Sequence, residues 1–242
     1  MPDAQPGPSH PTHPAIRHAV LITRPALDAS RTANRVQAMG WTPILAPLLT
    51  VEPRSIAHPH RIDAILVTSG NALPALAGLE RTPLLTVGDA TAARAQAAGF
   101  QAVSSAEGDA ADLVALTQNR CKPGMTLLLA SGAGQGRDLA KALRQAGFRV
   151  HRRVAYASHA VRTLPGAATQ ALRSGELRAA LFLSAETARV FAALVPAALR
   201  PTLLGVDALA IGHPAAAILA LLPWRRVRVS LTPTLDGLLT LL

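Results

Sequence analysis

The sequence is poor in cysteine, aromatic residues and long apolar runs, and each shortage excludes a class of protein. Cys121 is the only cysteine, which excludes a disulfide framework and a zinc site with four cysteine ligands and favours a reducing compartment. Only 3% of the residues are aromatic, so few rings are available to stack on nucleic-acid bases. The longest apolar stretch, 208–222, is interrupted by His213 and Pro214 and is shorter than the roughly 20 residues of a membrane span.

Lysine is also scarce, yet the chain has a formal charge of +10. Of its 24 basic residues, all except Lys122 and Lys141 are arginines. Arginine binds carboxylate and phosphate groups through paired hydrogen bonds, so the surplus could mark a polyanionic ligand. It could equally reflect the base composition of the genome. Because the arginines are dispersed along the chain and aromatic residues are few, we expect no nucleic-acid partner. The short apolar stretches predict no membrane partner.

The first 18 residues differ from the rest of the chain. They are rich in proline and histidine and lack the apolar segment of an export signal, so we expect a disordered leader and a cytoplasmic protein. Half of all residues are apolar, and 242 residues are enough for one or two domains with a substantial core.

After this leader, short apolar runs alternate with alanine-rich helical patterns. Residues 18–23, 62–68 and 84–87 are typical of buried strands, and a turn and a helical pattern follow each of them. The run 41–51 predicts a further strand that two prolines interrupt. Such alternation is typical of α/β proteins with parallel sheets.

The second half of the chain repeats the first. The segment LLLASGAGQGRDLAKALRQAGFRV is similar to VLITRPALDASRTANRVQAMGWTPI, and Gly147 lies 107 residues after Gly40. A second unit also recurs, with Gly212 lying 124 residues after Gly88. The units therefore follow in the order A, B, A′, B′, which predicts a duplicated domain rather than a solenoid.

Small polar residues follow six of the predicted strands. In a parallel sheet the carboxyl ends of neighbouring strands meet at one edge, where the turns into helices expose backbone N–H groups to anions. Each residue alone is most simply a helix cap, but six such turns together predict a binding edge for an anionic ligand. The candidates are Arg24, Thr68, Ser69, Asn71, Gly88, Asp89, Thr91, Ser131, Gly132, Ser184, Gly212 and His213.

The glycine-rich segment 131–137 does not match a nucleotide-binding motif. Its glycines are spaced G-x-G-x-G, so Arg137 stands where the third glycine of a dinucleotide motif belongs, and the expected acidic residue about 20 positions later is missing. We expect either a loop whose backbone approaches an anionic group or an ordinary tight turn. The histidines are scattered, and no metal site is predicted.

Tyr156 is the only tyrosine and lies in a strand-like stretch at the end of unit A′. A phenol that is held in a cleft can donate a proton to a leaving group. The simpler alternative is a half-buried tyrosine that only packs. No G-x-S-x-G motif indicates a serine nucleophile.

From about Ala19 to Leu242 the chain resembles the uroporphyrinogen-III synthase family. The order of its segments carries the resemblance: VLITRP, ILVTSGNAL, TVGDATAARAQAAGF, LLASGAGQGRDLAKALRQAGF, VAYA, LFLSAETA and AIG. The resemblance implies two flavodoxin-like α/β domains with parallel sheets, joined by a two-stranded linker. One domain would comprise 19–46 and 159–242 and the other 47–158, with linker strands near 47–53 and 154–159.

The resemblance also implies an activity. Members of this family close the linear tetrapyrrole hydroxymethylbilane, which carries eight carboxylates, into uroporphyrinogen III. Ring D is inverted through a spiro intermediate, and the reaction belongs to haem biosynthesis. The implied enzyme is a lyase without cofactor or metal, a monomer that contacts the preceding deaminase transiently.

Several site residues can be matched to the motifs of this family. Tyr156 matches the tyrosine that ends the A′ strand and becomes the candidate proton donor. Two positions depart from the family pattern: Asn71 stands where a basic residue is often found, and the segment after Gly212 lacks two threonines. The residues that match polar positions and would bind the substrate are Thr68, Ser69, Gly88, Asp89, Thr91 and Ser184.

The missing threonines favour one alternative function. On the same duplicated scaffold, a two-domain protein could bind or sense a small ligand without catalysis. Turnover of hydroxymethylbilane, as opposed to binding alone, separates the two hypotheses.

Overall fold

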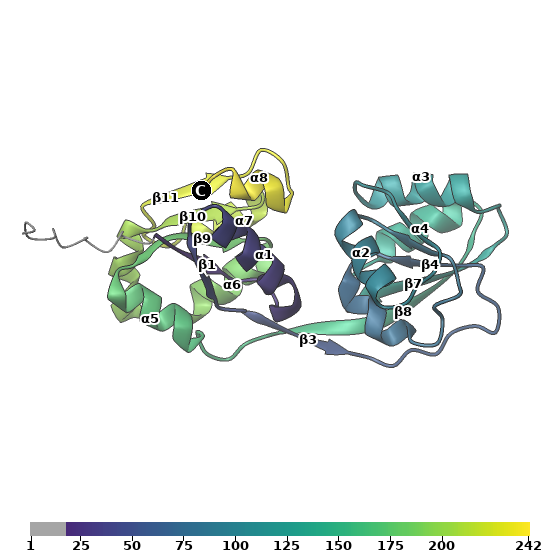
Figure 1. Cartoon of the computed structure of the whole chain (residues 1–242), viewed down its shortest axis with the longest axis horizontal. Helices are drawn as coiled ribbons and strands as arrows, with labels where there is room; N and C mark the ends of the chain where they lie inside the picture. The colour runs from purple at the N-terminus through teal and green to yellow at the C-terminus, as the bar shows by residue number, and fades with distance from the viewer. Residues whose placement is uncertain (1–17) are drawn as a thin grey trace, which may run out of the picture. The chain divides into compact units, whose positions relative to one another are not determined.

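The computed structural model describes residues 18–242, so the leader predicted over 1–18 lies outside the described residues except for His18. The described chain forms two compact units (Figure 1). Unit 1 comprises the residues up to Leu49 together with Val161–Leu242, and unit 2 comprises Thr50–Ala160. The chain therefore enters unit 2 once and returns once to unit 1.

Unit 1 is a five-stranded sheet with helices on both faces. The strands are ordered β11-β10-β9-β1-β2, and all neighbours are parallel. Alternate residues of β1 face opposite ways: Leu21 packs under α5, α6 and α7, whereas Val20 and Ile22 pack under α1 and α8. The bounds are β1 (Ala19–Ile22), α1 (Ala26–Ala38), β2 (Thr42–Leu45), α5 (Gly166–Ser174), β9 (Leu177–Phe182), α6 (Ala185–Leu194), the 3-10 helix η2 (Ala197–Gly205), β10 (Asp207–Ala210), α7 (His213–Leu219), β11 (Arg226–Val229) and α8 (Leu235–Leu239).

Unit 2 is a six-stranded sheet in the order β3-β8-β7-β4-β5-β6, parallel from β8 to β6. The edge strand β3 runs antiparallel to β8, because Thr50 and Arg54 donate hydrogen bonds to the carbonyls of His159 and Ala155 respectively. One face packs under α3 and α4, the other under η1 and α2. The bounds are β3 (Leu49–Pro53), β4 (Ala64–Val67), the 3-10 helix η1 (Gly70–Leu76), β5 (Leu84–Thr86), α2 (Asp89–Ala97), β6 (Val103–Ser105), α3 (Ala110–Arg120), β7 (Thr126–Gly132), α4 (Arg137–Gln145) and β8 (Arg149–Ala160).

The sequence repeat explains why the two sheets have the same topology. The parallel strands read β2-β1-β9-β10-β11 in unit 1 and β8-β7-β4-β5-β6 in unit 2. Unit A′ (β7, β8) thus takes the place of A (β1, β2), and B (β4 to β6) takes the place of B′ (β9 to β11). Unit 1 has the flavodoxin-like chain order, and unit 2 has the same spatial arrangement with its two segments in the opposite order along the chain. The predicted α/β fold with parallel sheets is confirmed. The order reverses between β1 and β9 in one sheet and between β7 and β4 in the other, and ligands of open α/β sheets bind at such reversals.

Two local predictions are wrong, and one predicted helix is of the 3-10 type. The run 41–51 forms two strands in different sheets, because the chain leaves β2 at Leu45 and begins β3 at Leu49 after Pro47. The helix after Ser69 is a 3-10 helix that contains Pro74, a residue without an N–H to donate. Ser131 and Gly132 belong to strand β7 rather than to the loop that follows it.

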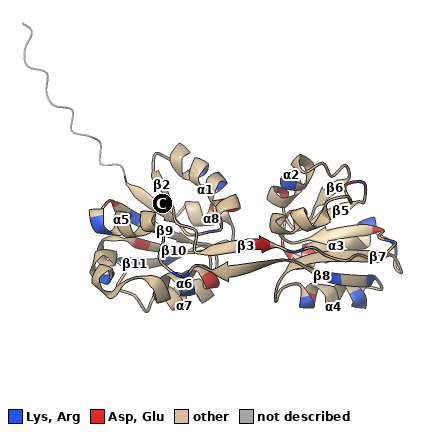
Figure 2. Ribbon diagram, turned by 90° about the horizontal axis from the view of Figure 1, so that it is seen from below, with Lys and Arg blue, Asp and Glu red and all other residues tan. Residues whose placement is uncertain are grey.

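Basic side chains are distributed over several elements of each unit (Figure 2). In unit 2 they lie on α2 and α4, among others, and in unit 1 on α5. This distribution agrees with the dispersed arginines of the sequence. Within residues 18–242 no helix is long and apolar enough to cross a membrane.

One ion pair of unit 1 fastens the segment after α7 to the sheet. Arg225 donates two hydrogen bonds to Asp207 at the start of β10, from Nε to Oδ1 at 2.7 Å and from Nη2 to Oδ2 at 2.8 Å. The Asp207 side chain is only 10% exposed. The hydrogen bonds from Arg225 lower the pKa of the Asp207 carboxyl, and the charges of Arg225, Arg226 and Arg228 lower it further against the opposing effect of burial.

We expect Asp207→Asn to lower the free energy of unfolding by about 1–2 kcal/mol, because the substitution removes the negative charge that strengthens the hydrogen bonds from Arg225. The pKa of Asp207 is depressed in the folded state, so this stabilisation is complete above the ordinary value of 3.8 and is lost as the pH falls through the folded pKa. Urea unfolding of both proteins at pH 7 and near pH 3 measures the difference. If the parent and the variant differ equally in the free energy of unfolding at both pH values, the role of the carboxylate is contradicted.

Candidate functional site

The site residues predicted from the sequence fall into two groups, one in each unit. Within each group they lie at or just after the carboxyl ends of strands, except for Tyr156, which lies within β8 and pairs with Gly132 at the end of β7. Each group includes residues on both sides of the reversal in strand order. Unit 2 holds Thr68, Ser69, Asn71, Gly88, Asp89, Thr91, Ser131, Gly132 and Tyr156, and unit 1 holds Arg24, Ser184, Gly212 and His213.

The turn after β4 buries a polar side chain. Ser69 caps η1 by accepting a hydrogen bond from the backbone N–H of Asn71, with a distance of 3.3 Å between N and Oγ. The Asn71 side chain is 8% exposed, and its Oδ1 accepts no hydrogen bond from the described residues. A buried acceptor without a donor costs about 1–3 kcal/mol. Thr68 precedes it at the end of the strand and is half-buried.

The turn after β5 opens the N-terminus of α2. Gly88 is its N-cap in an extended conformation, with φ −145°, and its carbonyl accepts hydrogen bonds from the N–H groups of Thr91 and Ala92. Asp89 lies exposed in the first turn, where a carboxylate interacts favourably with the helix dipole. Gly88 is thus a helix cap, which is the simplest role that the sequence predicts for it. Thr91 is half-buried in the first turn of α2.

Tyr156 and Gly132 are direct neighbours on β8 and β7. The Tyr156 ring lies so close to Gly132 that a Cβ at this glycine would be 2.8 Å from Cζ of the tyrosine. Only 4% of Tyr156 is exposed, and its ring belongs to the apolar cluster under η1 and α2. Its hydroxyl donates a hydrogen bond of 3.1 Å to Oε1 of Gln135, an exposed residue of the loop after β7. The ring is packed, and the hydroxyl is held at the loop edge.

The same loop receives an arginine that sequence reasoning missed. Arg152, from β8, donates hydrogen bonds through Nη1 to the carbonyl of Gln135 at 3.0 Å and to Oγ of the buried Ser131 at 3.5 Å. The Ser131 hydroxyl in turn donates to the carbonyl of Gln135 at 3.2 Å. Arg152 and Tyr156 thus both hydrogen-bond to Gln135, Arg152 to its carbonyl and Tyr156 to its side chain. No sequence signal pointed to Gln135 or Arg152, because the contacts join residues that lie 17 and 21 positions apart.

In unit 1 the arginine after β1 is held by its own helix. Arg24 donates a hydrogen bond of 3.1 Å from Nη1 to Oγ1 of Thr32, and its Nη2 lies 3.4 Å from Oδ2 of Asp28. Both charged side chains are largely buried, with exposures of 19% and 17%. The position at the strand end fits an anion, but the carboxylate of Asp28 competes for the same guanidinium.

The remaining unit 1 candidates cap helices. Ser184 caps α6, because its Oγ accepts a hydrogen bond of 3.1 Å from the N–H of Thr187. Gly212 is the N-cap of α7, and its carbonyl accepts hydrogen bonds from the N–H groups of Ala215 and Ala216. His213 is exposed in the first turn of that helix. Helix capping therefore accounts for Ser184 and Gly212 without a ligand.

Within residues 18–242 there is no group of three or more His, Cys, Asp and Glu side chains that could hold a metal ion. The described site contains hydrogen-bond donors and acceptors, guanidinium groups and one phenol hydroxyl.

Comparison with known proteins identifies the family. The family model described as uroporphyrinogen-III synthase HemD matches residues 30–240. The uroporphyrinogen-III synthetase of Helicobacter pylori has a similar fold, with a TM-score of 0.60 and 17% identity over 93% of this chain and 97% of that one. A mutant uroporphyrinogen III synthase of Thermus thermophilus aligns over 92% of this chain and 96% of its own, with 22% identity and a TM-score of 0.46. No match was found among curated proteins.

The family model spans nearly all of the described residues, including most of the first copy of the repeat and all but one of the site residues, Arg24, which precedes it. The resemblance inferred from the order of the sequence motifs is thus confirmed independently. The chain belongs to the uroporphyrinogen-III synthase family, whose members are enzymes of porphyrin and haem biosynthesis.

Proposed function

We propose that this chain catalyses the closure of hydroxymethylbilane to uroporphyrinogen III and so acts as a cyclising lyase. Its family membership over residues 30–240 is the observation that carries the proposal. The two sheets support it, because each presents polar and cationic groups at a strand-order reversal, where open α/β sheets bind ligands. The substrate carries eight carboxylates, for which guanidinium groups and backbone N–H groups are suitable partners.

The proposed reaction is a dehydration followed by a rearrangement. The bond between the hydroxymethyl carbon and its oxygen breaks, and the oxygen takes up a proton and leaves as water. The substituted carbon of ring D attacks the resulting azafulvene and forms a spiro intermediate, which fragments and recloses with ring D inverted. Closure releases a proton from the pyrrole, which balances the proton consumed. The protein must hold the substrate folded and stabilise positive charge on the pyrroles.

Tyr156 is the residue that we assign to the first step. Its hydroxyl is the only phenol of the chain, and its hydrogen bond to Gln135 fixes it at the loop edge of unit 2. A neutral phenol can protonate a departing hydroxyl and recover the proton after closure. The remaining predicted residues would bind the substrate through the caps and turns described above.

We further propose the setting of this reaction. A single cysteine is consistent with a reducing cytoplasm, in which a monomer would receive hydroxymethylbilane from the preceding deaminase by transient contact. The proposed chemistry needs proton transfer and charge stabilisation alone, so we assign no cofactor.

The direct test is the isomer that the protein makes. Purified protein is added to hydroxymethylbilane that is generated enzymatically, and the products are oxidised to porphyrins and separated by chromatography. We expect type III to replace the type I isomer that forms without a synthase.

Only type I product at the uncatalysed rate would contradict the proposal. If the protein nevertheless binds the tetrapyrrole, the result favours the alternative of a ligand-binding protein on the same scaffold. The absence of hydroxyls after Gly212, where the chain continues with His213, Pro214, Ala215 and Ala216, is the feature that favours this alternative.

A further inference from the structure

A guanidinium from α2 lies directly on the backbone of the turn after β4. A Cβ added to Gly70 would be 2.6 Å from Cζ of Arg94 and 2.7 Å from its Nε and Nη1. The φ angle of Gly70 is not positive, so its backbone conformation does not require glycine. What glycine provides is space, and the guanidinium of the half-buried Arg94 occupies it.

The residue after Gly70 supplies a hydrogen-bond acceptor, whereas the guanidinium supplies only donors. Asn71 follows Gly70 directly and is 8% exposed, and its Oδ1 lies buried without a hydrogen-bond donor among the described residues. The backbone N–H of the same residue is already used by Ser69. The turn thus packs against a guanidinium from α2 and holds a buried oxygen that lacks a donor among the described residues.

Gly70 and Asn71 lie at the edge of the sheet where ligands of this fold class bind. Gly70 and Asn71 begin η1 directly after β4, the strand on one side of the order reversal in unit 2. The carboxyl edge at such a reversal is where open α/β sheets bind ligands. Asn71 itself brings no positive charge to this turn, and Arg94 brings one from the neighbouring helix α2.

We propose that Arg94 and Asn71 form the binding site for one pyrrole ring of a polycarboxylate tetrapyrrole. This inference rests on the proposed function, which supplies the substrate class. Each ring of such a substrate presents an N–H donor flanked by side-chain carboxylates. The planar fork of Arg94 matches a carboxylate, and Oδ1 of Asn71 matches the pyrrole N–H. Gly70 is the residue that lets the guanidinium reach this place.

Two variants of unit 2 test the role of the guanidinium in different ways. Arg94→Ala removes it, whereas Gly70→Ala keeps the charge and displaces it with one methyl group. Because the displaced atoms are the end of a flexible side chain, Gly70→Ala is expected to fold normally. Arg81→Ala is the matched control, since this exposed arginine lies before β5, at the opposite edge of the same sheet.

The first readout is binding of uroporphyrin III, a stable octacarboxylate, followed by titration of protein fluorescence. We expect the dissociation constant to rise about tenfold in Arg94→Ala and in Gly70→Ala, and to stay within about twofold in Arg81→Ala. The double variant Gly70→Ala/Arg94→Ala should bind no more weakly than Arg94→Ala alone, because both changes remove one interaction. Equal affinities of Arg94→Ala and Arg81→Ala would overturn the proposal.

The second readout concerns Asn71. Because Asn71→Leu replaces a buried acceptor that lacks a donor, it should leave the melting temperature unchanged or raise it, while the KM for hydroxymethylbilane rises several-fold at a kcat within about twofold. A lower melting temperature with an unchanged KM would show a purely structural role. Failure of the proposed function would appear as missing type III product in the parent protein, whereas failure of this inference would appear as variants that bind uroporphyrin III like the parent.

Discussion

Replacement of Tyr156 by phenylalanine is expected to slow the formation of uroporphyrinogen III by about 10² or more, the usual size of a general-acid effect. This factor corresponds to about 2.7 kcal/mol in the activation free energy. The change removes one hydroxyl and keeps the ring, so the packing of the ring against Gly132 and the apolar cluster under η1 and α2 is preserved. The measurement is the initial rate of type III formation at saturating hydroxymethylbilane.

Gln135→Ala is the matched control for this prediction. It removes the acceptor that orients the hydroxyl at 3.1 Å but keeps the proton donor, so we expect a loss of at most about tenfold. The melting temperatures of both variants should stay close to that of the parent. If Tyr156→Phe retains the full rate, Tyr156 has no part in proton transfer and acts only in packing, as its 4% exposure also allows.

The duplication of the α/β unit could be predicted from the repeat because its signal is local. Gly88 and Gly212, which are 124 residues apart in the sequence, both cap a helix after a central strand. Ser69 and Ser184 likewise cap the elements that follow β4 and β9 through their hydroxyls. A cap is encoded by its own residue and the next three, so equivalent caps recur wherever the unit recurs.

The contacts that shape the candidate site could not be predicted because they join separate elements. Arg94 belongs to α2 by its helical pattern, and nothing in that pattern says that its guanidinium covers Gly70. The hydrogen bond between Gln135 and Tyr156 depends on the register of β7 against β8, which shifts between Ser131 and Gly132. Local sequence specifies each element, whereas these contacts follow from how elements pack.

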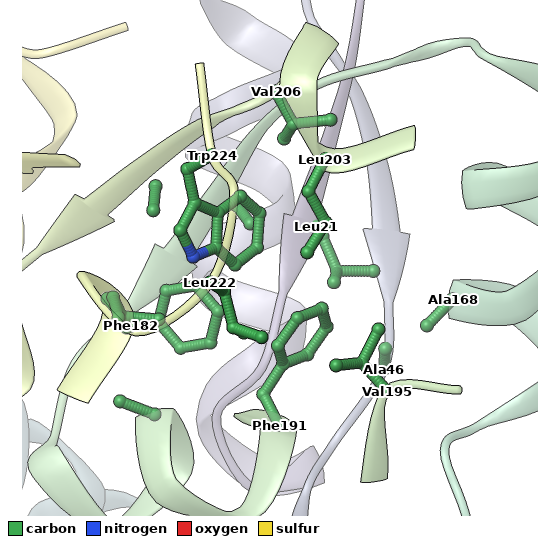
Figure 3. Close-up of a cluster of buried hydrophobic side chains, with 14 of the residues drawn as sticks. Leu21, Ala46, Ala168, Phe182, Phe191, Val195, Leu203, Val206, Leu222 and Trp224 are labelled. Carbon is green, nitrogen blue, oxygen red and sulfur yellow. The ribbon is translucent and has the colours of Figure 1, made fainter. Parts of the chain in front are cut away.

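The second large effect that we predict is on stability. Phe191→Ala is expected to lower the free energy of unfolding by about 3–5 kcal/mol, the usual cost of removing a buried aromatic ring. Phe191 is fully buried in unit 1 and lies in an aromatic cluster (Figure 3). Its ring centroid is 5.4 Å from that of Phe182, edge to face, and 5.3 Å from that of Trp224, which it stacks against. Aromatic pairs add about 0.5–1.5 kcal/mol each beyond the burial of area.

The composition of the chain makes this prediction easy to measure. Both tryptophans, Trp41 and Trp224, belong to unit 1, so tryptophan fluorescence during urea unfolding reports on that unit. Phe191→Leu is the control, because it keeps most of the apolar volume and should cost less than about 1.5 kcal/mol. Domains are stable by only about 5–15 kcal/mol, so the alanine variant should unfold at a much lower urea concentration than the leucine variant. Coincident midpoints would mean that neighbouring side chains fill the cavity, and the aromatic contacts would then contribute little to the stability of unit 1.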